Sequence, residues 1–153
     1  VEAMRGYEEV FLKLVIAGGS FEKVFQSEES IPSLNVVRVG YVTDGQLRSL
    51  YENALGFVFP SLYEGFGLPP LEAMICGCPV LVSNRASLPE VCGEAALYFD
   101  PASAEDVADK LRQLATSHRL RDDLREKGLE RAWQFTWEET ARKFLQIFFA
   151  EQH

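Results

Sequence analysis

This sequence has few histidines, few basic residues and no long hydrophobic run. Its longest apolar stretches have the length of a strand, well short of the roughly 18 residues that a membrane-spanning helix needs. No signal peptide is recognisable either. The two histidines, His118 and His153, lie in the C-terminal part, where we expect surface positions and not catalytic ones.

Cysteine is scarce as well, and its odd count of three argues against a framework of disulfide bonds. Cys76 and Cys78 are close together but lack the histidine or second cysteine pair of a zinc site. We therefore expect buried, reduced thiols and a cytoplasmic protein, associated with a membrane only through a domain outside this sequence.

Positive charge is under-represented, because 15 lysines and arginines stand against 23 aspartates and glutamates, a net charge of −8. This balance disfavours a nucleic-acid groove, although a helix N-terminus can still bind one phosphate group. The 153 residues fit one domain of ordinary globular composition, with 47% hydrophobic and 25% charged residues. Because the first residue is Val1, we expect the sequence to be part of a longer one.

Short apolar runs alternate with helical patterns, which predicts a parallel α/β sheet. The predicted strands are Leu12–Ala17, Val36–Val39, Phe57–Phe59, Val80–Ser83 and Ala96–Phe99. The predicted helices are Phe21–Gln26, one behind a capping box of Thr43 and Gln46, Leu68–Cys76, one capped by Ser103, one capped by Ser117 and broken or strained near Gly128, and one behind a capping box of Thr136 and Glu139. We predict a doubly wound, Rossmann-like sheet with C-terminal helices, which binds ligands at the carboxyl ends of its strands.

The most informative segment runs from Phe59 to Met74, where a strand leads through a glycine-bearing loop directly into a helix. A helix N-terminus in that place favours anions, because its first N–H groups have no partner within the helix. Prolines at 69 and 70 have no N–H, so the expected donors are Gly67 and Leu68, followed by Leu71. Gly65 and Gly67 lack a Cβ atom and would let a ligand approach the backbone.

Two carboxylates, Glu64 and Glu72, flank this predicted anion site. Carboxylates repel phosphate but accept hydrogen bonds from vicinal hydroxyl groups, as an acidic residue does with ribose in dinucleotide folds. The pair therefore suggests a ligand with phosphate in its middle and hydroxyl-rich groups on both sides, such as a nucleoside diphosphate sugar. The alternative is that both glutamates are solvated and simply favour the helix N-terminus.

At these residues the sequence resembles glycosyltransferase family 4, the retaining GT-B enzymes, in their C-terminal nucleotide-sugar-binding domain. The resemblance rests on two glutamates separated by seven residues, within the wording Glu-Gly-Phe-Gly-Leu-Pro-Pro-Leu-Glu-Ala-Met. Gly77-Cys78-Pro79-Val80 is similar to the family's next strand, and Gly40-Tyr41-Val42 to an earlier turn. Ser87-Leu88-Pro89-Glu90-Val91 looks like its Gly-Gly-x-Pro-Glu element, with Ala86 and Ser87 in place of the glycines.

The resemblance implies an enzyme of polysaccharide biosynthesis, with a role for each matched position. A mannose-like or glucose-like hexose would pass from a GDP- or UDP-hexose to an acceptor hydroxyl with retained configuration, without metal or cofactor. Glu64 would be the catalytic residue that contacts the transferred sugar, and Glu72 would bind the ribose. The diphosphate would lie at the backbone of Gly65, Phe66, Gly67 and Leu68, and the base at Gly40, Tyr41 and Val42. The acceptor, a sugar, lipid or protein, is not implied, and no nucleic-acid partner is expected.

The sequence departs from the family at its beginning. We expect residues 1–153 to form a donor-binding domain without its first strand, without the Arg and Lys that neutralise the diphosphate, and without the acceptor-binding domain. In the strand order 3-2-1-4-5-6 that first strand is central, so its loss would leave two strand edges unpaired. We therefore expect the isolated chain to bind a donor but not to transfer sugar.

Three alternatives remain open from the residues alone. The first is a GT-B epimerase or phosphorylase. The second is a non-catalytic module that binds a nucleotide sugar or docks a partner, which the apolar stripe of Trp137, Ala141, Phe144, Leu145 and Phe148 would suit. The third is a doubly wound domain for another phosphate ligand.

Overall fold

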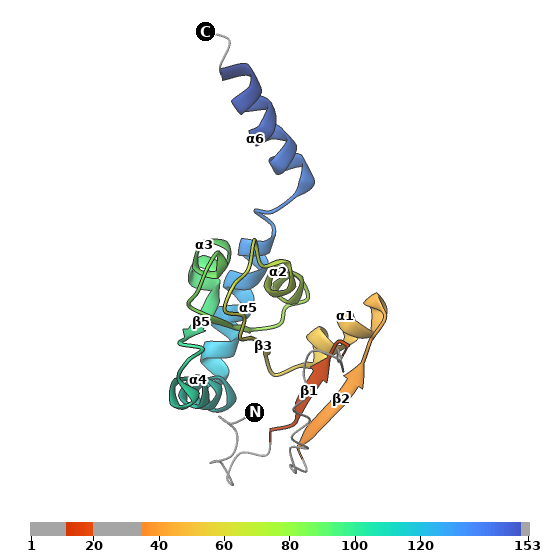
Figure 1. Cartoon of the computed structure of the whole chain (residues 1–153), viewed down its shortest axis with the longest axis vertical. Helices are drawn as coiled ribbons and strands as arrows, with labels where there is room; N and C mark the ends of the chain where they lie inside the picture. The colour runs from red at the N-terminus through yellow and green to blue at the C-terminus, as the bar shows by residue number, and fades with distance from the viewer. Residues whose placement is uncertain (1–11, 20–34, 151–153) are drawn as a thin grey trace.

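The computed structural model describes residues 12–19 and 35–150, which form parallel strands flanked by helices (Figure 1). The strands are β1 (Leu14–Ala17), β2 (Val36–Gly40), β3 (Phe57–Phe59), β4 (Val80–Ser83) and β5 (Ala96–Phe99). The helices are α1 (Asp44–Asn53), α2 (Leu68–Ile75), α3 (Leu88–Cys92), the 3-10 turn η2 (Gly93–Ala95), α4 (Ala104–Thr116), α5 (His118–Ala132) and α6 (Trp137–Ala150). The predicted helix 21–26 lies outside the described residues.

The strands of the described residues form two parallel sheets, one of β1 and β2 and one in the order β3-β4-β5. In the first sheet Leu14 pairs with Val36, so β1 begins two residues later than predicted, and Ala17 pairs with Gly40, so β2 ends one residue later. In the second sheet Phe57, Val80 and Ala96 lie side by side. The carboxyl ends of β3, β4 and β5 therefore share one edge, where the loop after β3 begins.

The hydrophobic core surrounds the central strand β4, whose four residues are all buried. Met74 of α2, Leu88 of α3 and Phe99 of β5 are almost fully buried around it. Buried strands of this kind correspond to short apolar runs in the sequence. The bounds of β3, β4 and β5 were therefore predicted as they are observed.

The predicted break of α5 near Gly128 is wrong, because the helix runs without interruption from His118 to Ala132. Gly128 is buried where α5 crosses α2, and a Cβ atom there would lie 3.2 Å from Cγ of Met74. The glycine therefore permits close packing of two helices, an effect that lies outside local helix propensity.

Local capping signals correctly located the starts of several helices. Thr43 and Gln46 form a complete capping box, and the hydroxyl groups of Ser103 and Ser117 accept N–H groups from α4 and α5. Only half of the box at Thr136 is seen: its hydroxyl accepts from the Glu139 N–H at 3.1 Å, while the Glu139 carboxylate pairs with arginine and lysine of its own helix. Helix α3 and the turn η2 were missed, because elements of five and three residues carry no periodic pattern.

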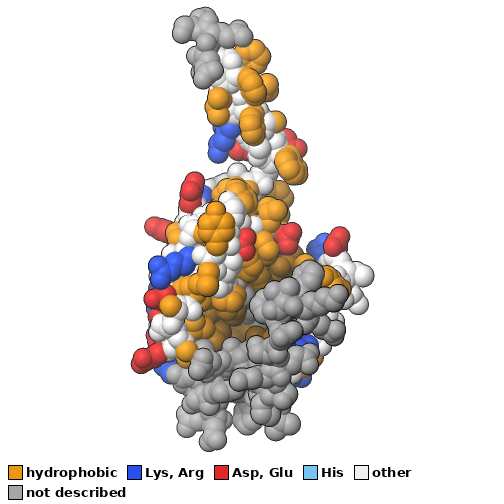
Figure 2. All heavy atoms as spheres, in the orientation of Figure 1, with side chains coloured by type: hydrophobic (Ala, Val, Ile, Leu, Met, Phe, Trp, Pro, Cys, Tyr) orange, Lys and Arg blue, Asp and Glu red, His pale blue; other side chains and the backbone are white. Residues whose placement is uncertain are grey.

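The last helix, α6, points away from the body of the molecule (Figure 1). Its apolar side chains are exposed along its length (Figure 2), and they include Trp137, Phe144, Leu145, Ile147, Phe148 and Phe149. Among the described residues, none of the helices combines the length and the apolar character needed to cross a bilayer.

Candidate functional site

The loop of residues 60–67 joins the carboxyl end of β3 to the N-terminus of α2. Its outer side is open to solvent, since Leu62, Tyr63 and Leu68 are all exposed. Helix α2 begins at Leu68 with no side chain capping it and with prolines in its first turn, as the sequence predicted. The N–H groups at this helix end thus face the loop that carries Glu64.

Gly67 sets the geometry at the start of α2. Its φ of 115° lies in the left-handed region that favours glycine, and a Cβ atom there would approach Cδ2 of Leu88 to 2.9 Å. The residue is buried, so its missing side chain also makes room for α3. Gly65, by contrast, is exposed and has nothing within 4 Å of where a Cβ atom would be.

Glu64 is half-buried, and its Oε1 accepts a hydrogen bond from the Ser61 hydroxyl at 2.8 Å. Glu72 lies on the second turn of α2 and is exposed. Burial, and next the negative charge of Glu72, raise the pKa of Tyr51 to about 12. The two glutamates therefore have different surroundings, one held by the loop and the other free to meet a ligand.

The predicted base-binding turn, Gly40 to Val42, begins at the last residue of β2 and meets the turn that follows β1. The Gly18 N–H donates to the Gly40 carbonyl at 2.8 Å, and Gly40 has a φ of 65°. A Cβ atom on Gly19 would collide with the ring of Tyr41, so the two turns are in direct contact. Tyr41 is 82% exposed and Val42 half-buried, which leaves the Tyr41 ring open to a ligand. Gly18 and Gly19 were not predicted to belong to this part of the site.

The segment before α3 retains a glycine-like conformation at a non-glycine residue. Ala86 has a φ of 51°, and within the described part of the chain it is the one residue other than glycine with positive φ. It stands where the resemblance predicted a glycine, and its φ lies in the left-handed region that glycine adopts most readily. Ser87, next to it, donates from its hydroxyl to the backbone of the loop that carries Glu64.

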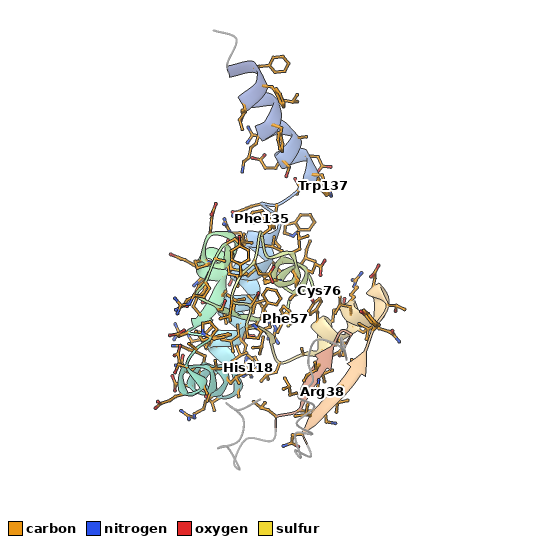
Figure 3. The ribbon with its side chains drawn as sticks, in the orientation of Figure 1. Arg38, Phe57, Cys76, His118, Phe135 and Trp137 are labelled. Atoms are coloured by element: carbon orange, nitrogen blue, oxygen red, sulfur yellow. The ribbon has the colours of Figure 1, made fainter. Side chains whose placement is uncertain are left out.

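Phe66 joins the loop to the end of α5. Its ring meets Phe135 edge-to-face at 5.7 Å, and the Arg131 guanidinium lies 4.9 Å from the centre of the Phe135 ring. Figure 3 shows Phe135 in the connection between α5 and α6. These contacts were not predictable from local pattern, because Phe66 and Phe135 are far apart in the sequence.

Other residue types contribute little to this region. His118 is exposed and pairs with Asp122, as expected for a surface histidine, whereas His153 lies outside the described residues. Over residues 12–19 and 35–150, no three His, Cys, Asp or Glu side chains gather as a metal site would require. Cys78 and Cys92 are buried as expected, but Cys76 is only half-buried.

Residues 1–131 match the family model of the glycosyl transferases group 1. The chain belongs to the group 1 glycosyltransferases. It is 44% identical to the O-antigen chain mannosyltransferase B of Escherichia coli over 110 residues. These residues make up 72% of this chain and 29% of that protein. It is 31% identical to the MMP alpha-(1->4)-mannosyltransferase of Mycolicibacterium hassiacum over 97% of this chain and 37% of that protein.

Among solved structures of this glycosyltransferase fold, the chain is similar to sucrose-phosphate synthase from Thermosynechococcus elongatus. The TM-score is 0.73 at 29% identity, over 90% of this chain and 39% of that one. The predicted Rossmann-like fold with C-terminal helices is thereby confirmed. The chain spans between 15% and 37% of the length of the curated relatives it matches.

Proposed function

We propose that this chain is the donor-binding part of a retaining hexosyltransferase that uses a nucleoside diphosphate sugar. The observation that carries the proposal is the loop 60–67, which brings half-buried Glu64 and the uncapped N-terminus of α2 to one sheet edge. An anion and a hydroxyl-bearing group on one ligand suit these two features.

Each part of the donor has a group suited to it. The diphosphate would accept hydrogen bonds from the N–H groups of Gly67 and Leu68, with Gly65 and Phe66 beside it. Glu64 would accept hydrogen bonds from the sugar, and Glu72 from the ribose. The base would lie at the exposed turn of Gly40, Tyr41 and Val42.

Mannose is the hexose that the relatives favour, since both curated relatives described above are named mannosyltransferases. GDP-mannose is therefore the first donor to test, ahead of UDP-hexoses. No metal or cofactor has a role in this proposal.

Catalysis needs more than the described residues offer. A helix N-terminus contributes about 2 kcal/mol at best to an anion, whereas enzymes lower barriers by roughly 8 kcal/mol or more. We infer that cationic groups and an acceptor-binding wall come from elsewhere in a longer protein, and that the isolated chain binds the donor without transferring sugar.

The division into two sheets supports a further part of the same proposal. Among the described strands β1 pairs with β2 alone and β3 with β4 alone, so each has an edge of backbone groups without a strand partner. We propose that a parallel strand from outside the described residues joins these edges, in the order β2-β1-new strand-β3-β4-β5.

The test is calorimetric titration of the chain with GDP, UDP and ADP and with their hexose conjugates, without divalent metal. We expect Glu72→Ala to weaken nucleoside diphosphate and conjugate alike by about tenfold, because ribose is common to both. Glu64→Ala should weaken only the conjugate. Equal losses for both ligands in both variants would contradict the assigned roles, and sugar transfer by the isolated chain would contradict its predicted inactivity.

A docking module is the second candidate, and the exposed apolar side chains of α6 favour it (Figure 2). If the chain is such a module, Glu64→Ala and Glu72→Ala would not change its affinity for any of the nucleotides.

A further inference from the structure

Three serine hydroxyl groups form hydrogen bonds with the loop that carries Glu64: that of Ser61, which belongs to the loop, and those of Ser83 and Ser87. Ser83 ends β4 and is fully buried, and its hydroxyl donates to the Ser61 carbonyl at 2.5 Å. Ser87 precedes α3, and its hydroxyl lies 2.7 Å from the Phe66 carbonyl and 3.1 Å from the Glu64 carbonyl. Two elements distant in sequence thus hold opposite ends of one short loop.

The Ser61 hydroxyl acts on the carboxylate itself. It lies 2.8 Å from Oε1 of Glu64 and 3.1 Å from the Tyr63 carbonyl, so its single proton is shared between the side chain and the turn. This contact fixes the direction of the Glu64 side chain and leaves Oε2 to accept hydrogen bonds from a ligand. Ser83 in turn holds the Ser61 backbone by a hydrogen bond. The buried strand β4 thereby helps to fix the position of the Glu64 carboxylate.

The loop needs such support because the middle of it makes few packing contacts. Tyr63 and Gly65 are exposed, and no atom lies within 4 Å of where a Cβ atom of Gly65 would be. Loop backbone with few buried contacts opens at low free energy unless hydrogen bonds restrain it. Ser87 bonds to carbonyl groups on both sides of Gly65 and supplies that restraint.

We propose that Ser61 and Ser87 are positioning residues that hold the Glu64 carboxylate ready for the sugar of the donor. The proposal rests on the proposed function, because it deepens the role of the same site. It assigns no contact between either serine and the sugar. Ser61 acts through the Glu64 carboxylate, so it affects recognition of the conjugate and not of the nucleotide. Ser87 also holds Phe66, which lies beside the proposed diphosphate position, so it affects both ligands, and the conjugate more strongly.

The first measurement is binding by Ser61→Ala and Ser87→Ala, with GDP and GDP-mannose, and with UDP and UDP-glucose, as the probes. We expect Ser61→Ala to bind the conjugate about tenfold more weakly and the nucleoside diphosphate within about twofold of the wild type. Ser87→Ala should weaken both ligands, with the larger loss for the conjugate. Ser87→Thr keeps the hydroxyl and should restore binding of the conjugate. Ser49→Ala, at an exposed serine of α1, is the matched control and should change neither ligand.

The second measurement needs no ligand: ¹⁵N relaxation of the Gly65 and Phe66 amides. We expect order parameters near 0.85 in the wild type, Ser49→Ala and Ser87→Thr, and below about 0.6 in Ser87→Ala. A loop that stays rigid in Ser87→Ala, or equal weakening of nucleotide and conjugate, would overturn the positioning role. If the wild type binds no nucleotide, the proposed function fails for this chain, and relaxation alone decides whether Ser87 positions the loop.

Discussion

Single residues in this chain often satisfy a backbone requirement and a packing requirement at once. Gly67 adopts a left-handed φ at the start of α2 and also leaves room for Leu88. The sequence alone predicts that both Gly65 and Gly67 allow a ligand to approach the backbone closely. The tertiary structure separates them, because only Gly67 is buried against a neighbouring helix.

We therefore expect substitution by alanine to destabilise the fold at Gly67 and to have little effect at Gly65. Gly67→Ala should lower the free energy of unfolding by at least about 2 kcal/mol, since it adds both backbone strain and a steric clash. Gly65→Ala is the matched control and should change the free energy of unfolding by less than about 0.5 kcal/mol. Urea denaturation of both variants measures the difference, and similar values for the two would contradict the packing role of Gly67.

Secondary-structure elements distant in sequence are joined at the end of α5. Arg131 donates from Nε to the Val91 carbonyl at 2.9 Å and from Nη2 to the Glu90 carbonyl at 2.7 Å. These acceptors belong to the last residues of α3, whose carbonyl groups lack partners within the helix. The same guanidinium lies over the ring of Phe135, which packs edge-to-face on Phe66 of the loop. Arg131 thus connects α5, α3 and the candidate site.

We expect Arg131→Ala to lower the free energy of unfolding by about 2–3 kcal/mol, because two carbonyl groups and one aromatic ring lose their partner. Arg131→Lys should retain only part of the stability that Arg131→Ala loses, since an ammonium group cannot reproduce the planar arrangement of donors. Arg119→Ala, at an exposed position of α5, is the control and should cost less than about 0.5 kcal/mol. Equal stabilities of the alanine variants in urea would show that the connection contributes nothing.

The molecule as a whole buries several weak acids in their protonated forms. Burial raises the pKa of Cys78 to about 12 and that of Cys92 to about 11. It likewise raises the pKa of both Tyr51 and Tyr98 to about 12. Ordinary values are 9.0 for the thiols and 10.0 for the phenols, so the unfolded chain ionises first as pH rises.

The folded state therefore binds more protons than the unfolded state above about pH 9, and its stability must fall as pH rises through this range. We expect the urea midpoint to be constant from pH 7 to 8.5 and to decrease steadily from pH 9 to 11. A double variant, Cys78→Ala with Cys92→Ala, should show a shallower decrease because two of the four groups are gone. A midpoint that stays level or increases above pH 9 would contradict the burial of these groups.

Local sequence pattern determined much of this protein. Strands β3, β4 and β5, the caps of α1, α4 and α5, and the sequence motif around Glu64 and Glu72 could all be recognised, because each depends on residues close together in the chain. Tertiary structure alone decided the rest, because the interacting groups are far apart in sequence. Gly128 makes room for Met74 of α2, and Ser83 and Ser87 hold the loop by hydrogen bonds. The ring of Phe66 packs against that of Phe135. Such contacts form only when the chain has folded, and no propensity or periodicity encodes which residue will meet which.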